Sequence, residues 1–304
     1  MVRCSDYSNN GACYFENFPE CLNDPVEMEL GSAGGVRWFM KLSKLQSETL
    51  FAPMIYFKSN NRNIQVGVAI CCEVWHWEYD RMSKKKIMNL SDCFTGSPIE
   101  ILDIPRTVTI EYGIHVESIK FENGIWKFNF AERHIDFEKN LEELTIKFDD
   151  PYSNDQSLHC PKQFLKFHSS VVSQYISSKP ACLSSETINM NRSFGFNTLE
   201  KCLQIAYGVR PRLSPGDCED LIIVAEKLNL QNVIRYIEQE LIQQQYSPEN
   251  LSYKCRNLKR YMANVLKRMD SFEQFGNICG YWEVSELKPE IVKMILDKFM
   301  ETEF

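Results

Sequence analysis

Alternating apolar and polar positions dominate the first half of the chain. In VRWFMKLSKL, one face of an extended chain carries Val36, Trp38, Met40 and Leu42, and the other carries Arg37, Lys41 and Ser43. This pattern is typical of a strand that buries one face. Similar runs follow at LFAPMIYFK (50–58), IQVGVAI (64–70) and TVTIEYGIHV (107–116). Short strands separated by polar turns predict an antiparallel β-sandwich.

Two positions in this half predict local features of the strands. Pro53 interrupts an otherwise regular strand pattern, and proline indicates an edge strand or a bulge because it lacks a backbone donor. Asn123-Gly124 separates the aromatic-rich arms IKFE and IWKFNF. This dipeptide predicts a hairpin with a type I′ turn, in which both residues have positive φ.

The pattern changes to a helical period in the second half of the chain. NTLEKCLQIAYG predicts a helix capped by Asn197, and Ser214-Pro215 predicts the start of the next helix. Ser247-Pro248 predicts the start of a long helix that runs to Met269, and PEIVKMILDKF predicts a last amphipathic helix. A β-rich domain therefore precedes an α-rich domain, with the boundary near residue 132.

Composition narrows the class of protein. The chain has 304 residues, 44% of them apolar, and a net charge of −7. This length suggests two domains, and the absence of a dense basic patch argues against a nucleic-acid partner. The longest nearly apolar run, VGVAICC, is much shorter than the ~20 residues of a membrane span.

The first ten residues and the distribution of the cysteines predict where in the cell the protein is located. MVRCSDYSNN has no apolar signal segment, so we expect a soluble cytoplasmic protein. Nuclear entry would follow if SKKK (83–86) acts as an import signal, although a solvated turn is the alternative. The 12 cysteines are scattered and include no C-x-x-C pair, which indicates reduced thiols.

The stretch LHCPKQFLKFHS (158–169) is the strongest candidate for chemistry. His159, Cys160 and His168 supply at most three ligands, whereas a zinc site uses four, usually in paired short spacings. No signature supports a Cys–His catalytic pair either. A strand that leads into a helix explains the stretch better, so we expect no metal, no cofactor and no enzymatic activity.

Two longer segments resemble a known family. LTIKF…SLHCPKQFLKFHSSVVSQYI and DLIIVAEKLNLQNVIRYIEQELI resemble the BTB (POZ) domain over residues 134–245. YGVRP and the helical tail resemble the nematode-type MATH–BTB proteins. GGVRWFMKLSKL, with Trp38, resembles the second strand of a MATH domain, and the family's Trp-Gly element stands here as Thr95-Gly96.

The resemblance implies an α+β chain of three parts. Residues 15–131 would form a MATH/TRAF-like β-sandwich, residues 132–245 an α/β BTB domain, and residues 246–304 a helical extension of the 3-box or BACK type. Such a protein is implied to be a non-enzymatic, homodimeric substrate adaptor of a cullin-RING ubiquitin ligase that uses the third cullin. The alternative is a BTB homodimeric scaffold that does not bind cullin.

The resemblance also implies site residues and partners. The partners are a second copy, the cullin and a substrate protein with a degron peptide, and neither nucleic acid nor a membrane. The cullin-binding motif of the family, hydrophobic-x-Glu, falls on Pro180, Ala181 and Cys182, so cullin binding is expected to be weak. The remaining residues are the dimer contacts Phe164, Leu165 and Phe167, and the substrate-groove residues Tyr56, Thr95 and Gly96. A core position is the alternative for the tyrosine.

Overall fold

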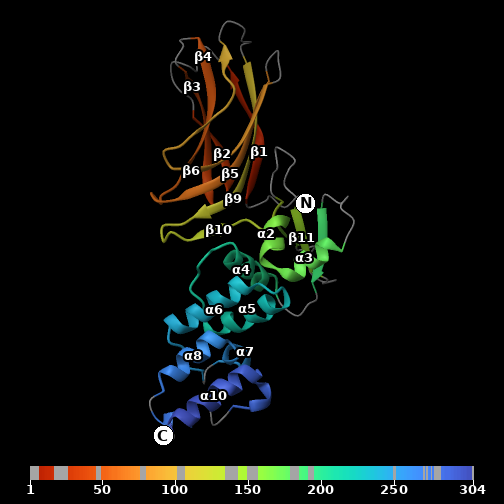
Figure 1. Ribbon diagram of the computed structural model, residues 1–304. Helices are drawn as coiled ribbons and strands as arrows, with labels where there is room; N and C mark the ends of the chain where they lie inside the picture. The colour runs from red at the N-terminus through yellow and green to blue at the C-terminus, as the bar shows by residue number, and fades with distance from the viewer. Residues whose placement is uncertain are drawn as a thin grey trace. The chain divides into compact units, whose positions relative to one another are not determined.

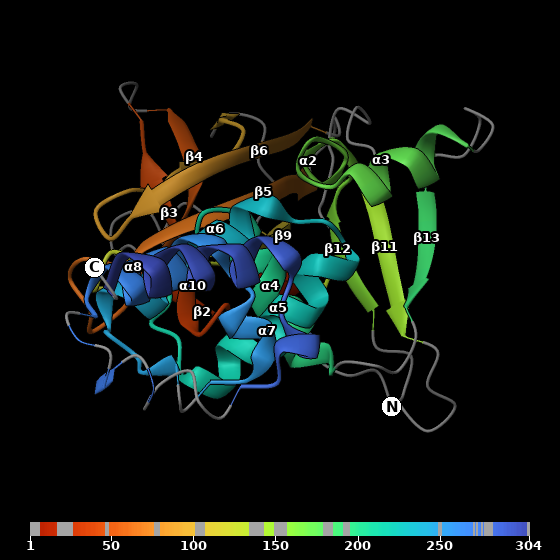
Figure 2. The same ribbon diagram turned by 60° about the horizontal axis from the view of Figure 1, so that its bottom comes forward.

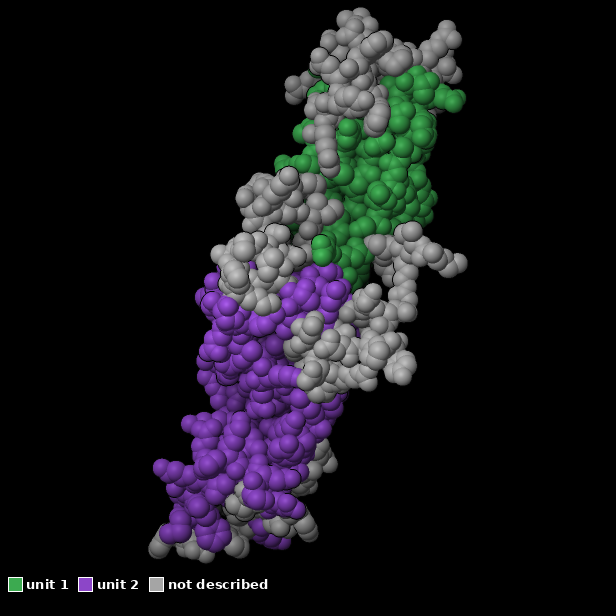
Figure 3. All heavy atoms as spheres, turned by 90° about the vertical axis from the view of Figure 1, so that its right-hand side faces the viewer, with its two compact units in different colours: residues 1–141 green, residues 142–304 purple. Residues whose placement is uncertain are grey.

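The chain forms two compact units, residues 1–141 and residues 142–304, which Figure 3 colours separately. The computed structural model describes residues 7–16, 27–45, 49–75, 80–100, 107–133, 143–148, 157–178, 185–190, 195–248, 251–269, 271, 273–274, 276 and 282–302. Within these ranges, no helix is both long enough and apolar enough to cross a bilayer.

The first unit consists of two antiparallel β-sheets (Figure 1). One sheet has the strand order β1-β9-β5-β6, with β10 also paired to β9, and the other has the order β2-β3-β4-β7, with β8 also paired to β4. The strands are β1 (Ser8–Glu16), β2 (Glu27–Ala33), β3 (Val36–Lys44), β4 (Leu50–Lys58), β5 (Gln65–Trp75), β6 (Asp80–Asn89), β7 (Phe94–Thr95), β8 (Ile99–Glu100), β9 (Thr107–Lys120) and β10 (Trp126–Phe128). The predicted antiparallel β-structure is confirmed.

One hydrophobic cluster contains residues of both sheets. Trp38 of β3, Ile55 of β4 and Ile110 of β9 are completely buried in it. The indole Nε1 of Trp38 donates a hydrogen bond to the carbonyl of Ala33 at 3.2 Å, so its one polar group is satisfied. Successive side chains of a strand point to opposite faces, and the apolar positions of β3 therefore face this core as predicted.

Pro53 does not lie on an edge strand, but the ladder on one side of it changes register by one residue, as the predicted bulge would. β4 pairs with β3 without a register shift, and Pro53 stands opposite Leu42. On its other side, β4 pairs with β7 at Met54–Ile55 and with β8 at Leu50–Phe51. Pro53 lies between these two short ladders, where no donor is needed, so a proline is accommodated inside the sheet.

The hairpin predicted at Asn123-Gly124 is confirmed, but its turn differs. β9 and β10 pair antiparallel, and the N–H of Gly124 donates to the carbonyl of Phe121 at 2.9 Å. Gly124 has a φ of 76°, whereas Asn123 does not have a positive φ. The Asn123 side chain instead accepts the N–H of Ile125 at 3.0 Å. A turn with a single left-handed glycine therefore replaces the type I′ turn.

The second unit begins with a three-stranded sheet of order β12-β11-β13 (Figure 2). β11 (Glu143–Phe148) pairs antiparallel with β12 (Ser157–Pro161) and parallel with β13 (Ser185–Met190), which confirms the predicted pairing of LTIKF with SLHC. The helical elements are α2 (Lys162–His168), α3 (Ser170–Ser177), α4 (Phe196–Ala206), α5 (Pro215–Lys227), α6 (Gln231–Gln243), α7 (Tyr253–Arg256), α8 (Lys259–Lys267), the 3-10 helix η3 (Val284–Glu286) and α10 (Pro289–Thr302).

The observed starts of the helices agree only in part with the starts predicted from the sequence. Ser214 caps α5 and forms a reciprocal capping box with Asp217, which confirms this start. The predicted cap at Asn197 is wrong, because α4 begins after Gly195 without a side-chain cap. The last predicted helix is confirmed as α10.

The single helix predicted between residues 247 and 269 is also wrong, because α7 and α8 are separate helices. The side chain of Asn257, which lies between them, donates to the carbonyl of Glu286 at 2.8 Å and accepts the N–H of Lys288 at 2.6 Å. These two hydrogen bonds connect the residue between α7 and α8 to the backbone just before α10. An amide side chain that bonds to a distant backbone favours such an interruption over a continuous helix.

Candidate functional site

The outer face of the β2-β3-β4-β7 sheet carries an aromatic pair with lysines above it. Phe39 of β3 stands opposite Tyr56 of β4, and the two rings stack with their centroids 6.1 Å apart. Nζ of Lys58 lies 4.3 Å from the centroid of Phe39, and Nζ of Lys41 lies 5.5 Å from that of Tyr56. These cation–π contacts hold the lysine side chains along the sheet.

Glu27, the first residue of the edge strand β2, is the acceptor that Tyr56 and Lys58 share on this face. Its carboxylate accepts hydrogen bonds from the hydroxyl of Tyr56 and from Nζ of Lys58. The bond from Lys58, followed by that from Tyr56, lowers the pKa of Glu27. Burial, followed by the hydrogen bond to Glu27, raises the pKa of Tyr56. Tyr56 is therefore a half-buried, protonated residue of the outer face and not a core residue.

Thr95 lies on the same face, but Gly96 has a packing role. Thr95 is exposed and stands opposite Met54 of β4. Met54 and Tyr56 are two residues apart on this strand, so their side chains lie on the same face of the sheet. Gly96 is buried, and its N–H donates to the carbonyl of Pro53 at 2.8 Å. A Cβ at Gly96 would lie 2.7 Å from Cγ of Pro53, so the missing side chain lets β7 approach β4.

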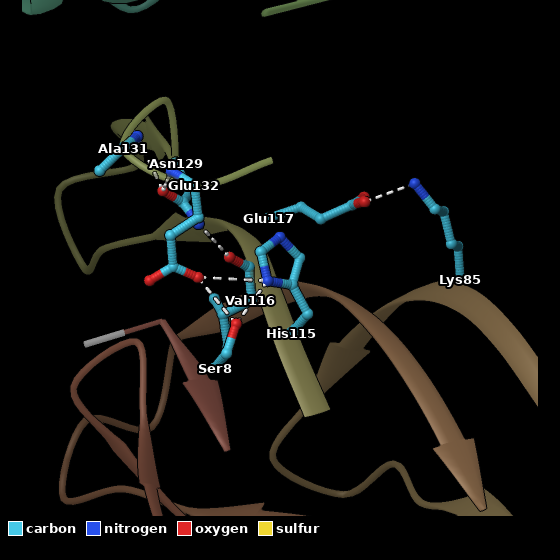
Figure 4. Close-up of polar contacts among 8 residues, drawn as sticks. All are labelled: Ser8, Lys85, His115, Val116, Glu117, Asn129, Ala131 and Glu132. Atoms are coloured by element: carbon cyan, nitrogen blue, oxygen red, sulfur yellow. Dashed lines mark hydrogen bonds and ion pairs between the residues drawn. The ribbon is translucent and has the colours of Figure 1, made fainter. Parts of the chain in front are cut away.

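A partly buried polar cluster on the other sheet contains a serine, a histidine and a glutamate (Figure 4). Oγ of Ser8 lies 2.7 Å from Nδ1 of His115 and donates to Oε2 of Glu132 at 2.7 Å. Oε2 also lies 3.4 Å from the same Nδ1. In a catalytic triad, the serine and the carboxylate contact different ring nitrogens. This cluster therefore lacks the geometry of a hydrolase and joins β1 to β9 and the segment after β10.

Sequence reasoning missed this cluster, because Ser8 is 107 residues from His115 and 124 residues from Glu132. Asn129 holds the end of the same segment in place (Figure 4). Its Nδ2 donates to the carbonyl of Val116 at 3.1 Å, and its Oδ1 accepts the N–H of Glu132 at 3.3 Å. A short polar motif around residue 129 is a weak signal of such a turn.

In the second unit, α2 exposes one aromatic side chain and buries its neighbour. Phe167 is 85% exposed, whereas Leu165 is fully buried in its own chain. The ring of Phe164 is half-buried, with its centroid 3.7 Å from that of Tyr207 and 4.4 Å from that of His168. Of the three predicted interface residues, Phe167 is therefore open to a partner, Phe164 is partly open, and Leu165 is a core residue.

Ser169 fixes the corner between α2 and α3. It is completely buried, and its Oγ accepts the N–H of Val172 at 3.0 Å as the N-cap of α3. The same hydroxyl donates to the carbonyl of Leu228, and Ser169 forms a β-bridge with Leu230. The buried contacts of Ser169 therefore fix the C-terminal end of α2, the helix that carries Phe167.

The histidines around Cys160 contact residues of the β11-β12 hairpin and of α2. Nδ1 of His159 lies 3.3 Å from Oγ1 of Thr145, and its Nε2 lies 3.1 Å from Oγ of Ser157. Cys160 is buried, and His168 packs against aromatic rings of α2. The described ranges contain no group of three or more His, Cys, Asp or Glu side chains that could hold a metal ion. The predicted strand and helix of this stretch are confirmed.

Comparison with protein families identifies the part of the chain that carries these elements. Residues 137–245 match the BTB/POZ domain family. This segment is a BTB/POZ domain. It runs from β11 to the end of α6, and the N-terminal sheets and the helices after residue 245 lie outside the match. BTB domains are protein-interaction modules that commonly self-associate and bind cullins.

The comparisons with curated proteins and with solved structures do not indicate a function for this chain. No curated protein matches the chain. Among solved structures, the Salmonella enterica trimeric lipoprotein SadB is similar over 36% of this chain and 64% of that chain, with 6% sequence identity and a TM-score of 0.24. The chain thus spans less than two thirds of that protein, and a likeness at this score supports no argument about fold or function.

The remaining predicted site falls outside the described residues of the BTB domain. Pro180, Ala181 and Cys182 follow α3, which ends at Ser177, and precede β13. Their assignment to a cullin-facing loop stays a prediction.

Buried polar contacts join the BTB domain to the helices that follow it. Glu238 of α6 is 6% exposed and accepts the N–H of Arg260, at the start of α8, at 2.8 Å. The hydroxyl of Tyr261 donates to the carbonyl of Tyr246 at 2.8 Å. A carboxylate at a helix N-terminus is favourable because free N–H groups and the positive dipole end meet there. α8 is therefore anchored on α6.

Proposed function

We propose that this chain is a non-enzymatic adaptor that brings a substrate protein to a cullin-RING ubiquitin ligase. The observation that carries the proposal is the BTB/POZ domain at residues 137–245, which shares one chain with a separate compact unit of antiparallel sheets. An adaptor performs no chemistry. It raises the effective concentration of substrate lysines near the charged ubiquitin-conjugating enzyme, and two copies in a dimer add avidity.

The BTB domain self-associates in this proposal through α2. The support is the side chain of Phe167, which is 85% exposed although it is large and apolar. Aromatic side chains contribute heavily to interfaces when they are buried near the centre of the contact. In a two-fold dimer, each copy would bury its own Phe167 and the open edge of Phe164 against the same surface of the other copy.

The substrate binds in this proposal to the outer face of the β2-β3-β4-β7 sheet. Tyr56 and Thr95 line that face, and Lys41 extends it. The buried ring of Phe39 stacks with Tyr56, and Gly96 lets β7 lie close to β4. Aromatic rings flanked by fixed polar groups suit an extended peptide, whose backbone needs hydrogen-bond partners and whose side chains need apolar contact.

The cullin binds to the BTB domain weakly in this proposal. Pro180 and Cys182 replace the hydrophobic residue and the glutamate of the docking motif. The remaining affinity comes from the rest of the BTB surface and from the helices after residue 245. Pro180→Met with Cys182→Glu restores both groups and should tighten binding, by a factor of ten for every ~1.4 kcal/mol gained.

Light scattering of the full chain, with and without the third cullin, tests the proposal. We expect a dimer alone and a heavier complex with cullin, and calorimetry should show tighter binding for Pro180→Met with Cys182→Glu. The alternative function, a homodimeric scaffold, is favoured if the chain is a dimer and neither version binds cullin. A monomeric wild-type chain would contradict both functions.

A further inference from the structure

A groove of about 760 Å³ lies over the outer face of strands β1, β9 and β5. It belongs to the sheet that does not carry Tyr56 and Thr95, so it is separate from the proposed substrate face. Two rows of residues, each paired across the three strands, line it: Asn10, Gly113 and Cys71 in one row, and Ala12, Glu111 and Glu73 in the other.

The groove is hollow because its floor has few large side chains. Gly113 has no side chain on the central strand, and Ala12 has only a methyl group on β1. Sγ of Cys71 lies 2.7 Å from the position that a Cβ at Gly113 would take, so this sulfur leans over the glycine.

Two carboxylates face each other at one end of this floor. Glu73 and Glu111 are directly opposite in an antiparallel pair, where Cβ atoms lie about 5 Å apart and like charges are destabilising. In the part of the chain that the structure describes, neither carboxylate has a hydrogen bond or an ion pair. Arg81 stands next to Glu73 in register on β6, one strand further from Glu111. The groove therefore combines an open floor with two facing carboxylates, of which Glu111 has Ala12 and Glu73 as its neighbours in register.

We propose that this groove binds an extended segment of a partner protein through an arginine that lies between Glu73 and Glu111. A guanidinium carries five N–H donors in a fixed plane and can bond to two carboxylates at once. Such charge-assisted hydrogen bonds are stronger than bonds between neutral groups, and the cation offsets the repulsion between the two carboxylates. Asn10, on the same side of the groove floor as Gly113, adds an amide for the backbone of the segment.

Selection from a library of random octapeptides on the full chain tests the proposal. The library is first depleted on the variant Glu73→Gln with Glu111→Gln. We expect the retained peptides to be enriched in arginine, and we expect their affinity, measured by calorimetry, to fall about tenfold or more on this variant. The variant loses a like-charge pair, so its thermal midpoint should not fall. Glu122→Gln with Glu301→Gln, which removes two exposed acids outside the groove, should bind as the wild type does.

A steric variant and a modified peptide make the test independent of charge effects on folding. Ala12→Trp should fill the groove and abolish binding, and citrulline in place of arginine should abolish it as well. The proposal is overturned if arginine is not enriched, or if the selected peptides bind equally to the Glu73→Gln, Glu111→Gln variant. Binding that appears only after Arg81→Ala would also overturn it, because the arginine of the chain itself would then occupy the site.

Discussion

Leu165 and Phe167 lie two residues apart on α2 and face opposite environments: Leu165 is fully buried, and Phe167 is 85% exposed. Residues two positions apart on a helix point about 200° apart, so one packs inward when the other projects into solvent. This relationship decides which substitution can test self-association without unfolding the BTB domain.

Phe167→Asp should convert the dimer into a monomer in light scattering. The far-UV circular dichroism of the protomer should stay unchanged, because the side chain is mostly exposed within its own chain and its ring contact there is with His168. Phe121→Asp is the matched control, since Phe121 is 43% exposed in the turn after β9 and should leave the mass unchanged. A dimer that survives Phe167→Asp would place the contact elsewhere.

Chelators should leave the thermal midpoint unchanged. The ring nitrogens of His159 lie within hydrogen-bond distance of Thr145 and Ser157, and His168 packs on the rings of Phe164 and Phe167, so these groups have structural partners. A structural zinc would contribute on the order of 10 kcal/mol, and its removal would be obvious. Release of a stoichiometric metal together with a lower midpoint would contradict the interpretation.

Gly96→Ala should lower the free energy of unfolding by about 1–3 kcal/mol, because its Cβ would overlap Pro53 and approach Cys72. Urea titration measures the change. Gly216→Ala is the control, since no atom lies within 4 Å of a Cβ there and the helical position favours alanine. A neutral Gly96→Ala would show that β4 and β7 can separate without cost.

The buried thiols should resist alkylation. Burial, as the largest cause, raises the pKa of Cys72, Cys218 and Cys255 to about 12 each, so these thiols stay protonated in the native state near neutral pH. Cys71 and Cys93 are partly exposed and should react with iodoacetamide before these three buried thiols. Mass spectrometry of the labelled native chain checks the order, and early labelling of Cys218 would contradict it.

The same shifts predict that stability falls in alkali. Unfolded thiols lose their protons near the ordinary value of 9.0, whereas these three keep theirs up to about 12. Their contribution to stability is complete below the unfolded pKa and is lost as the pH rises through this window. Urea titrations across the window should show the loss, and replacing the three cysteines by alanine should reduce the slope.

Glu238→Ala should loosen α8, because the N–H of Arg260 loses its buried acceptor. Loss of a capping acceptor costs about 1–2 kcal/mol. Hydrogen exchange of the Arg260 amide and the thermal midpoint both report the change. Glu238→Gln keeps an acceptor and should be milder, and Gln239→Ala, at an exposed neighbour, should change neither measurement.

Features that depend on a few neighbouring residues could be predicted from the sequence. The alternation around Trp38 predicted a buried strand face, and Ser214 with Asp217 predicted a capping box, because both follow from residue spacing within one element. The BTB domain was predicted for the same reason, since its identifying segments are short and continuous.

Features that depend on which strands become neighbours required the tertiary structure. Pro53 is tolerated inside a sheet only because β7 and β8 pair on either side of it. The pair of Glu73 with Glu111 and the contact of Ser8 with His115 each join strands that are distant along the chain. Local residue patterns determine which face of a strand is apolar, but the partner and its register follow from how the whole core packs, and only the folded chain decides them.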